Sequence, residues 1–183
     1  DLAVLAGPAD PEEVTALLRA RVPHLAVWAD EAIGVVGPLV VPGLTACLRC
    51  ADLARAERDP AWPLILAQAE DRPRACDAVL AAGTAALAAR QALTFLDQPA
   101  LDQPGLDQPG RDQSALGQPG LTQPGRDQPG AGPATLNGTL ELVLPDWQWR
   151  RRTWRPHPAC VCGASERPAQ ELDRCGDGRI RSV

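Results

Sequence analysis

The sequence predicts an α/β domain, and two observations lead to this prediction. A short apolar run at 1–6 is followed by an amphipathic helix pattern at 10–22 and by a second apolar run at 24–29. Strand, helix and strand in this order form a βαβ unit, whose strands pair in parallel through a right-handed crossover. Two close cysteine pairs, far apart in the chain, are the second observation, because together they predict one metal site that closes the domain.

The first helix has a well-marked beginning. Asp10 is suited to the N-cap, Pro11 to the first turn, and Glu12 and Glu13 to the positive end of the helix. The strand before it ends at a Gly-Pro pair, which is a typical turn signal.

The middle of the chain predicts a strand followed by two helices. The apolar run at 32–43 is broken by two glycines and a proline, which indicates a bent strand or two short ones. Residues 48–59 read as a short helix, and the Ala-rich segment 75–96 as a long helix with Cys76 inside it. The small residues of the long helix permit close approach to a sheet or another helix.

Two strands are predicted near the end of the chain. Residues 138–144 and 147–154 both alternate between apolar and polar side chains. In the second strand this alternation places four residues on one face of the sheet: Trp147, Trp149, Arg151 and Thr153.

Residues 97–131 consist of seven five-residue units of the DQPG type. Pro or Gly in nearly every unit disfavours helix and sheet, and the few leucines bury too little area to offset chain entropy. We therefore expect a disordered, low-complexity loop. The expected organisation is an α/β region at 1–96, the loop at 97–133, a completing segment of the same domain at 134–167, and a polar tail at 168–183.

Composition excludes several classes of protein. The net charge is −5 and all 18 basic residues are Arg, which argues against broad nucleic-acid binding. No uninterrupted apolar run is long enough to cross a membrane, and no secretory signal opens the sequence. We expect a cytoplasmic protein. A first residue other than Met suggests a fragment or a processed chain.

The four paired cysteines are the best candidates for a metal site. Cys47 and Cys50 have the C-x-x-C spacing of a zinc knuckle, and four soft thiolates are the usual shell of structural zinc. Cys160 and Cys162 are one residue closer than that spacing, and His157 could replace one of them. Buried thiols without metal and a redox-active first pair are the alternatives.

The other candidate residues carry weaker signals. Cys76 is expected in the core, and Cys175, in the polar tail, receives no role. Asp30 and Glu31 follow a strand and could touch a ligand or magnesium, although a solvated loop end explains them as well. Because no G-x-G-x-x-G, P-loop or G-x-S-x-G motif occurs, no catalytic residue is assigned, and the cofactor-binding residues stay unknown.

The order of these parts resembles the C-terminal half of the ThiF/E1-like family, the ubiquitin-like modifier-activating and sulfur-carrier adenylyltransferases. More closely, "GVVGPLVVPGLTACLRC" (34–50), "DPAWP" (59–63) and "RRRTWRPHPACVCGA" (150–164) are similar to actinobacterial ThiF-like proteins. Those proteins are described as cyclodehydratase-type or leader-peptide-binding components of thiazole/oxazole peptide biosynthesis.

The resemblance implies a Rossmann-like fold, a structural zinc on Cys47, Cys50, Cys160 and Cys162, and a dimer that adenylates a carboxylate with Mg-ATP. It also implies a peptide or carrier-protein substrate and a partner cyclodehydratase. The family's glycine-rich nucleotide loop precedes the region seen here. Its D-x-T-D-N motif has only Asp10 as a counterpart in "LAVLAGPAD" (2–10), where Asp10 serves well as a helix cap.

Three hypotheses of function follow. The first is an N-terminally truncated member of the adenylyltransferase family, inactive alone. The second is a non-catalytic E1-like scaffold that binds a precursor leader peptide for bacteriocin-type cyclodehydration. The third is a zinc-stabilised structural domain without an E1-like role.

Overall fold

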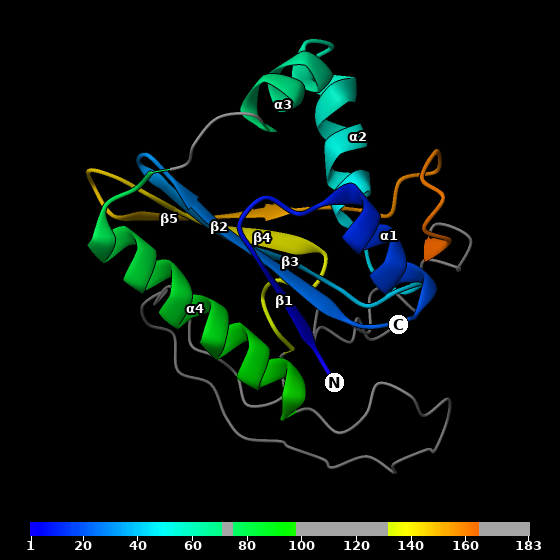
Figure 1. Ribbon diagram of the computed structural model, residues 1–183, viewed down its shortest axis with the longest axis horizontal. Coiled ribbons are helices and arrows are strands. Elements are labelled where there is room, and N and C mark those ends of the chain that lie inside the picture. Colours follow the sequence, from blue (N-terminus) through cyan, green and yellow to red (C-terminus); the bar gives the residue numbers. More distant parts are fainter. Residues whose placement is uncertain (71–74, 98–131, 165–183) are drawn as a thin grey trace, which may run out of the picture.

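The computed structural model describes residues 1–70, 75–97 and 132–164, which form five strands and four helices (Figure 1). In chain order these are β1 (Ala3–Ala6), α1 (Pro11–Arg19), β2 (His24–Asp30), β3 (Ile33–Val40), α2 (Leu48–Arg58), α3 (Trp62–Glu70), α4 (Ala78–Leu96), β4 (Gly138–Val143) and β5 (Gln148–Thr153).

The strands form one mixed sheet in the order β1-β2-β3-β4-β5. β1 pairs with β2 in parallel, as the βαβ pattern predicts, while β2–β3, β3–β4 and β4–β5 are antiparallel. The links between β2 and β3 and between β4 and β5 are too short for a crossover, so these pairs must be hairpins. The described residues therefore form an α/β fold with a mixed sheet. A Rossmann-like parallel sheet is not confirmed.

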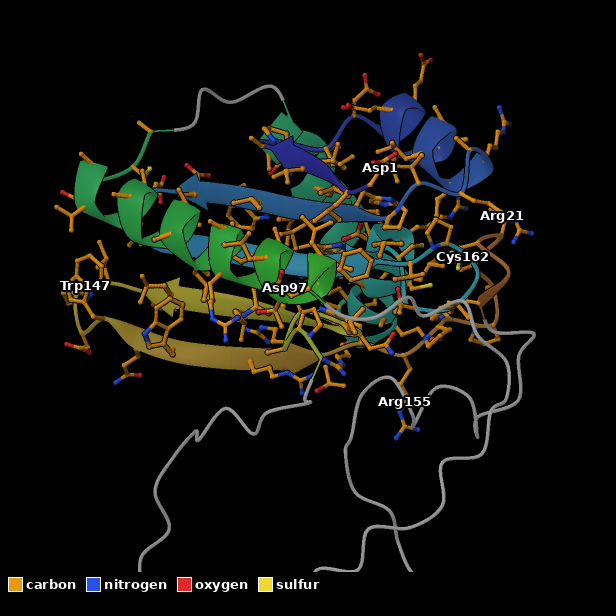
Figure 2. All side chains as sticks on the ribbon, turned by 90° about the horizontal axis from the view of Figure 1, so that it is seen from below. Asp1, Arg21, Asp97, Trp147, Arg155 and Cys162 are labelled. Atoms are coloured by element: carbon orange, nitrogen blue, oxygen red, sulfur yellow. The ribbon has the colours of Figure 1, made fainter. Side chains whose placement is uncertain are left out.

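Helices cover both faces of this sheet. In Figure 2, α4 runs along the near face while α2 lies on the far side. α4 contacts β2 and β3 through a buried stripe made of Leu80, Thr84, Ala88 and Gln91. Gly34 of β3 is required beneath it, because a Cβ at that position would collide with the Thr84 side chain. The long helix does lie close to the sheet, and the tight approach is made at Gly34 of the strand, while most alanines of α4 face outward.

The outer side of α4 remains apolar. Val79, Leu93 and Leu96 are exposed there. By length and composition α4 could cross a membrane, which no uninterrupted apolar run in the sequence had suggested. A single such helix is weak evidence, because core helices of soluble proteins pass the same test, and α4 packs one face against β2 and β3.

Two expectations about helices are corrected. Cys76 lies outside the long helix, because Asp77 caps α4 by accepting hydrogen bonds from Val79 and Leu80, and Cys76 instead forms an isolated β-bridge with Glu31. The helix α3 was not predicted. Its sequence begins Trp62-Pro63, and proline in a first turn is compatible with a helix because that turn has no hydrogen-bond acceptor for its N–H groups.

The other elements follow their sequence patterns with shifted ends. The α1 cap forms as expected, since Asp10 Oδ1 accepts the Glu12 N–H at 2.8 Å and Pro11 occupies the first turn. The bent strand becomes the single strand β3 followed by the loop that leads to Cys47. Trp149, Arg151 and Thr153 alternate along β5, whereas Trp147 lies in the preceding turn with a positive φ of 51°.

Candidate metal centre

The first cysteine pair occupies the N-terminal end of α2. Cys47 is the N-cap residue, with an extended backbone, and Cys50 lies in the first turn. The unpaired N–H groups and the positive dipole end of a helix favour thiolates there. The C-x-x-C spacing therefore presents two sulfurs on one side of the helix end.

The second pair lies in the loop after β5. The Trp154 N–H donates to Asn137 O at 2.8 Å where the strand ends, and the Cys160 N–H donates to His157 O at 2.9 Å to form a tight turn. Gly163, at φ 76°, reverses the chain directly after Cys162. The shortened C-x-C spacing is thus accommodated by a turn and does not separate its sulfurs from the first pair.

The four sulfurs come together across this long separation in sequence. Sγ–Sγ distances are 3.5 Å for Cys47–Cys160, 3.5 Å for Cys50–Cys162 and 3.7 Å for Cys47–Cys50. All four sulfurs lie within 4.8 Å of one another. A tetrahedral zinc with bonds of about 2.3 Å requires sulfurs about 3.8 Å apart. The spacing fits a four-thiolate site, so these cysteines are placed to hold a metal ion.

Burial also fits such a site. Cys47, Cys50 and Cys160 are buried and Cys162 is half-buried. They belong to an apolar cluster with Val40, Ala46, Ala51 and Trp154. Several thiolates in such surroundings require a cation to compensate their charge.

Hydrogen bonding within the cluster shifts the pKa values of two of its cysteines in opposite directions. Hydrogen bonds from Cys162 and Cys47, together with the backbone N–H of His157, lower the pKa of Cys50 to about 4. Hydrogen bonds to Cys162 and Cys50, and burial, raise the pKa of Cys47. A metal ion that binds here would therefore displace protons from the remaining thiols.

His157 supports the cluster from outside it. Its backbone N–H donates to Cys50 Sγ at 3.3 Å. Its ring Nδ1 accepts the Ala159 N–H at 3.1 Å, so the ring proton is on Nε2, which donates to Glu57 Oε1 at 2.9 Å. Because both ring nitrogens are engaged, His157 holds the second loop against α2 and does not replace a cysteine.

Three further residues attach the cluster to the sheet, and the sequence analysis missed them. Thr45 Oγ1 accepts the Val41 N–H at 2.8 Å and so shapes the loop before Cys47. Asn137 Oδ1 accepts the Ala46 N–H at 2.7 Å, and Trp154 Nε1 donates to Thr139 Oγ1 at 3.3 Å. These contacts depend on tertiary structure, so they cannot be predicted from the local spacing of residues.

A stacked cation joins α2 to the second cysteine segment. The Arg55 guanidinium lies over the Trp154 ring at 4.5 Å and over the Trp62 ring at 4.9 Å. Asp52 Oδ1 accepts hydrogen bonds from Arg55 at 3.0 Å and from Trp62 Nε1 at 3.3 Å. Arg55 therefore couples α2, α3 and the end of β5 near the metal site.

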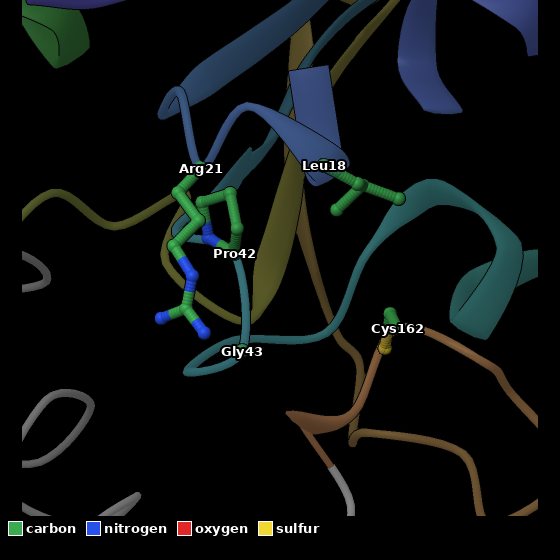
Figure 3. A pocket seen from close by; sticks show the side chains of 5 residues that line it. All are labelled: Leu18, Arg21, Pro42, Gly43 and Cys162. Atoms are coloured by element: carbon green, nitrogen blue, oxygen red, sulfur yellow. The ribbon is translucent and has the colours of Figure 1, made fainter. Parts of the chain in front are cut away.

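A small pocket of about 90 Å³ lies beside the cluster (Figure 3). Its walls are Leu18, Arg21, Pro42, Gly43 and Cys162. It makes Cys162 the cysteine of the cluster that faces a cavity, and the other three sulfurs are more deeply buried.

The remaining candidate residues lie elsewhere. Cys76 is half-buried and is not part of the sulfur cluster. Asp30 ends β2, and Glu31 follows at φ 48° with its N–H donating to Ala75 O at 2.7 Å. Cys175 lies outside the described residues, as does most of the expected loop.

Comparison with solved structures identifies proteins of similar fold, whereas no protein-family model and no curated protein sequence matches the chain. E. coli MccB bound to selenomethionine MccA aligns over 89% of this chain and 39% of MccB, with 18% identity and a TM-score of 0.55. The microcin C7 biosynthetic enzyme MccB with N-formylated MccA aligns over 89% and 41%, with 19% identity and a TM-score of 0.56. The chain shares its fold with MccB.

A second protein shows the same likeness. The heterocyclase TruD aligns over 90% of this chain and 22% of its own, with 18% identity and a TM-score of 0.52. The chain thus spans about two-fifths of MccB and about a fifth of TruD. At such identities the likeness concerns the fold alone.

Proposed function

We propose that this chain is the zinc-bearing portion of a ThiF/E1-like protein that acts in peptide modification. The observation that carries the proposal is the four-sulfur cluster, which joins the start of α2 to the loop after β5. It lies within a fold shared with MccB, a structure of which contains the peptide MccA, and with the heterocyclase TruD. The substrate we propose is therefore a peptide carrying a free carboxylate.

In this proposal zinc has a structural role. Four cysteine ligands close the tetrahedron and leave no position for water or substrate. Cys47, Cys50, Cys160 and Cys162 would hold the ion, and His157 would orient Cys50 through its backbone N–H. Zinc would supply the cross-link between two distant segments, and three of its four ligands, Cys47, Cys50 and Cys160, would hold it from buried positions.

The reaction we propose for the whole protein is adenylation of a peptide carboxylate, with release of pyrophosphate from ATP. It is tested by ATP–pyrophosphate exchange in the presence of peptides with a free or an amidated C-terminus. Exchange that requires the free carboxylate is the expected result for the whole protein, and no exchange is expected for residues 1–183 alone. Absence of exchange in the whole protein would reject this reaction.

One observation favours a second candidate, the non-catalytic scaffold. Asp10 is the acidic residue that follows β1, and its carboxylate is occupied in capping α1. A carboxylate committed to a helix cap is poorly placed to hold magnesium as well. Under this reading the protein binds a precursor peptide and passes it to a separate ATP-using cyclodehydratase, so peptide binding without exchange is the expected result.

A further inference from the structure

Strand β5 forms an edge of the described sheet. It pairs with β4 on one side, and no described strand lies on its other side. Figure 2 shows β5 as the outermost strand, with Trp147 near its beginning and Arg155 beyond its end. All six residues of β5 are exposed.

The register determines which backbone groups point outward. The Trp154 N–H donates to Asn137 O, so this opposed pair is hydrogen-bonded. In an antiparallel ladder such pairs alternate, so residues 148, 150 and 152 bond to β4. Trp149, Arg151 and Thr153 therefore direct their N–H and C=O groups away from the sheet, and none of these groups is bonded to another described residue.

The side chains on this edge are aromatic and basic. Trp149 is 56% exposed and Trp147 is 44% exposed. Arg152 is paired with Glu141 at 2.5 Å, whereas Arg150 has no ion pair with any described residue. Arg151 donates to Ala134 O at 2.9 Å and to Thr153 Oγ1 at 3.2 Å, neither of which cancels its charge. The edge is thus positive in a chain whose net charge is −5.

We propose that the β5 edge, defined as Trp147, Trp149, Arg150, Arg151 and Thr153, binds an acidic peptide segment in extended conformation. The segment would add a strand to the sheet through the outward backbone groups. An apolar side chain of the segment would lie against Trp149 on one face of the added strand, and acidic side chains would lie beside Arg150 on the other face. The proposal rests on the proposed function in taking a peptide as the partner.

Two other occupants fit less well. A second copy of the chain would set the arginines of one β5 against those of the other, and like charges in facing positions destabilise strand pairs. A nucleic acid would match the charge, but its phosphates only accept hydrogen bonds, so they cannot pair with the outward C=O groups as a strand does. An acidic peptide satisfies both the charge and the backbone groups.

The test uses a labelled, end-capped octapeptide of alternating Glu and Val, whose binding to the intact chain is followed by fluorescence anisotropy at low and high salt. Binding that weakens as salt rises is expected, because exposed charges contribute. A Lys-for-Glu peptide is expected not to bind. Equal binding of the two peptides, no binding of either, or tighter binding of single-stranded oligonucleotide would overturn the proposal.

A pair of variants isolates the backbone contribution. Trp149→Ala removes the ring, whereas Trp149→Pro also removes one outward N–H while leaving the bonds to β4, a position where edge strands tolerate proline. We expect Trp149→Pro to bind at least about tenfold more weakly than Trp149→Ala, with both variants as thermally stable as each other to within a few degrees. Equal affinities, or a wild-type dimer that Trp149→Pro dissociates, would reject the proposed strand addition.

A second pair tests the charge. Arg150→Glu is expected to abolish binding of the acidic peptide, while Arg58→Glu, an exposed change at the far end of α2, is expected to leave it unchanged. Because the probe is not a substrate, the outcome is independent of pyrophosphate exchange. If the acidic peptide binds but ATP–pyrophosphate exchange is absent, only the proposed reaction is rejected. If exchange is present but the acidic peptide does not bind, only the proposed binding at the β5 edge is rejected.

Discussion

The sulfurs of Cys47 and Cys160 lie 3.5 Å apart although 113 positions separate them in the sequence. One belongs to the start of α2 and the other to the loop after β5. In an unfolded chain such a separation carries a large entropic cost of closure, so a metal held between the two segments stabilises the folded state.

Metal analysis should find about one zinc per chain, held by four thiolates. Cys47→Ser should lose the metal and reduce the free energy of unfolding by at least about 3 kcal/mol, since metal binding and folding are linked. Cys76→Ser is the matched control, because Cys76 lies outside the cluster. Full zinc occupancy in Cys47→Ser would contradict the proposed site.

Removing His157 should weaken metal binding without removing a ligand. His157→Ala loses the ring contacts to Ala159 and Glu57, so the second loop is held less firmly against α2. Loss of such supporting contacts typically lowers metal affinity about 10- to 100-fold, measured by competition with a chelator. Glu57→Gln, at an exposed carboxylate, should change affinity far less. An equal effect of the two substitutions would show that the ring contributes only through Glu57.

We expect that the stacked Arg55 cannot be replaced by lysine without a loss of stability. Arg55→Lys keeps the charge but loses the planar group that stacks on Trp62 and Trp154, so it should destabilise the fold by about 1–2 kcal/mol in chemical denaturation. Arg49→Lys, an exposed change on the same helix, should stay within about 0.5 kcal/mol of the parent chain. Similar losses in both variants would mean that stacking contributes nothing specific.

His24 should make stability depend on pH. Burial lowers its pKa, and its Nε2 is buried without a hydrogen-bond partner while Nδ1 bonds to Val22 O at 3.0 Å. Below its ordinary pKa of about 6.5 the unfolded chain takes up a proton that the folded chain does not, so stability falls as pH decreases through that region.

The measurement is the free energy of unfolding from pH 8 to 5 for the parent chain and for His24→Leu. The parent should lose more stability than the variant below about pH 6.5, while protonation of the cysteines affects both equally. Parallel curves over the whole range would exclude His24 as the source.

Shortening the low-complexity segment should have a small effect. Replacing residues 98–131 by six Gly/Ser residues should change the free energy of unfolding by at most about 1.5 kcal/mol, because closure entropy depends only logarithmically on length. A loss of several kcal/mol would show that the segment contributes packing.

Much of the local structure was predictable from the sequence. The cap at Asp10, the parallel β1–β2 pair and the long helix α4 follow from side-chain periodicity and turn residues, which act over a few positions. Helix α3 was not predicted, although its Pro63 lies in a first turn, where proline is compatible with a helix. The position of Cys76 was wrong because the cap at Asp77 was overlooked.

The sequence by itself was enough to identify the cysteines that could bind metal and to predict the strand–helix pattern around them. Only the tertiary structure decided that His157 faces Glu57, that Asn137 and Arg55 support the cluster, and that β5 is left at an edge. The physical reason is that periodicity and capping depend on neighbouring residues. These contacts depend instead on which distant strands and helices pack together, and this packing cannot be predicted from a local sequence pattern.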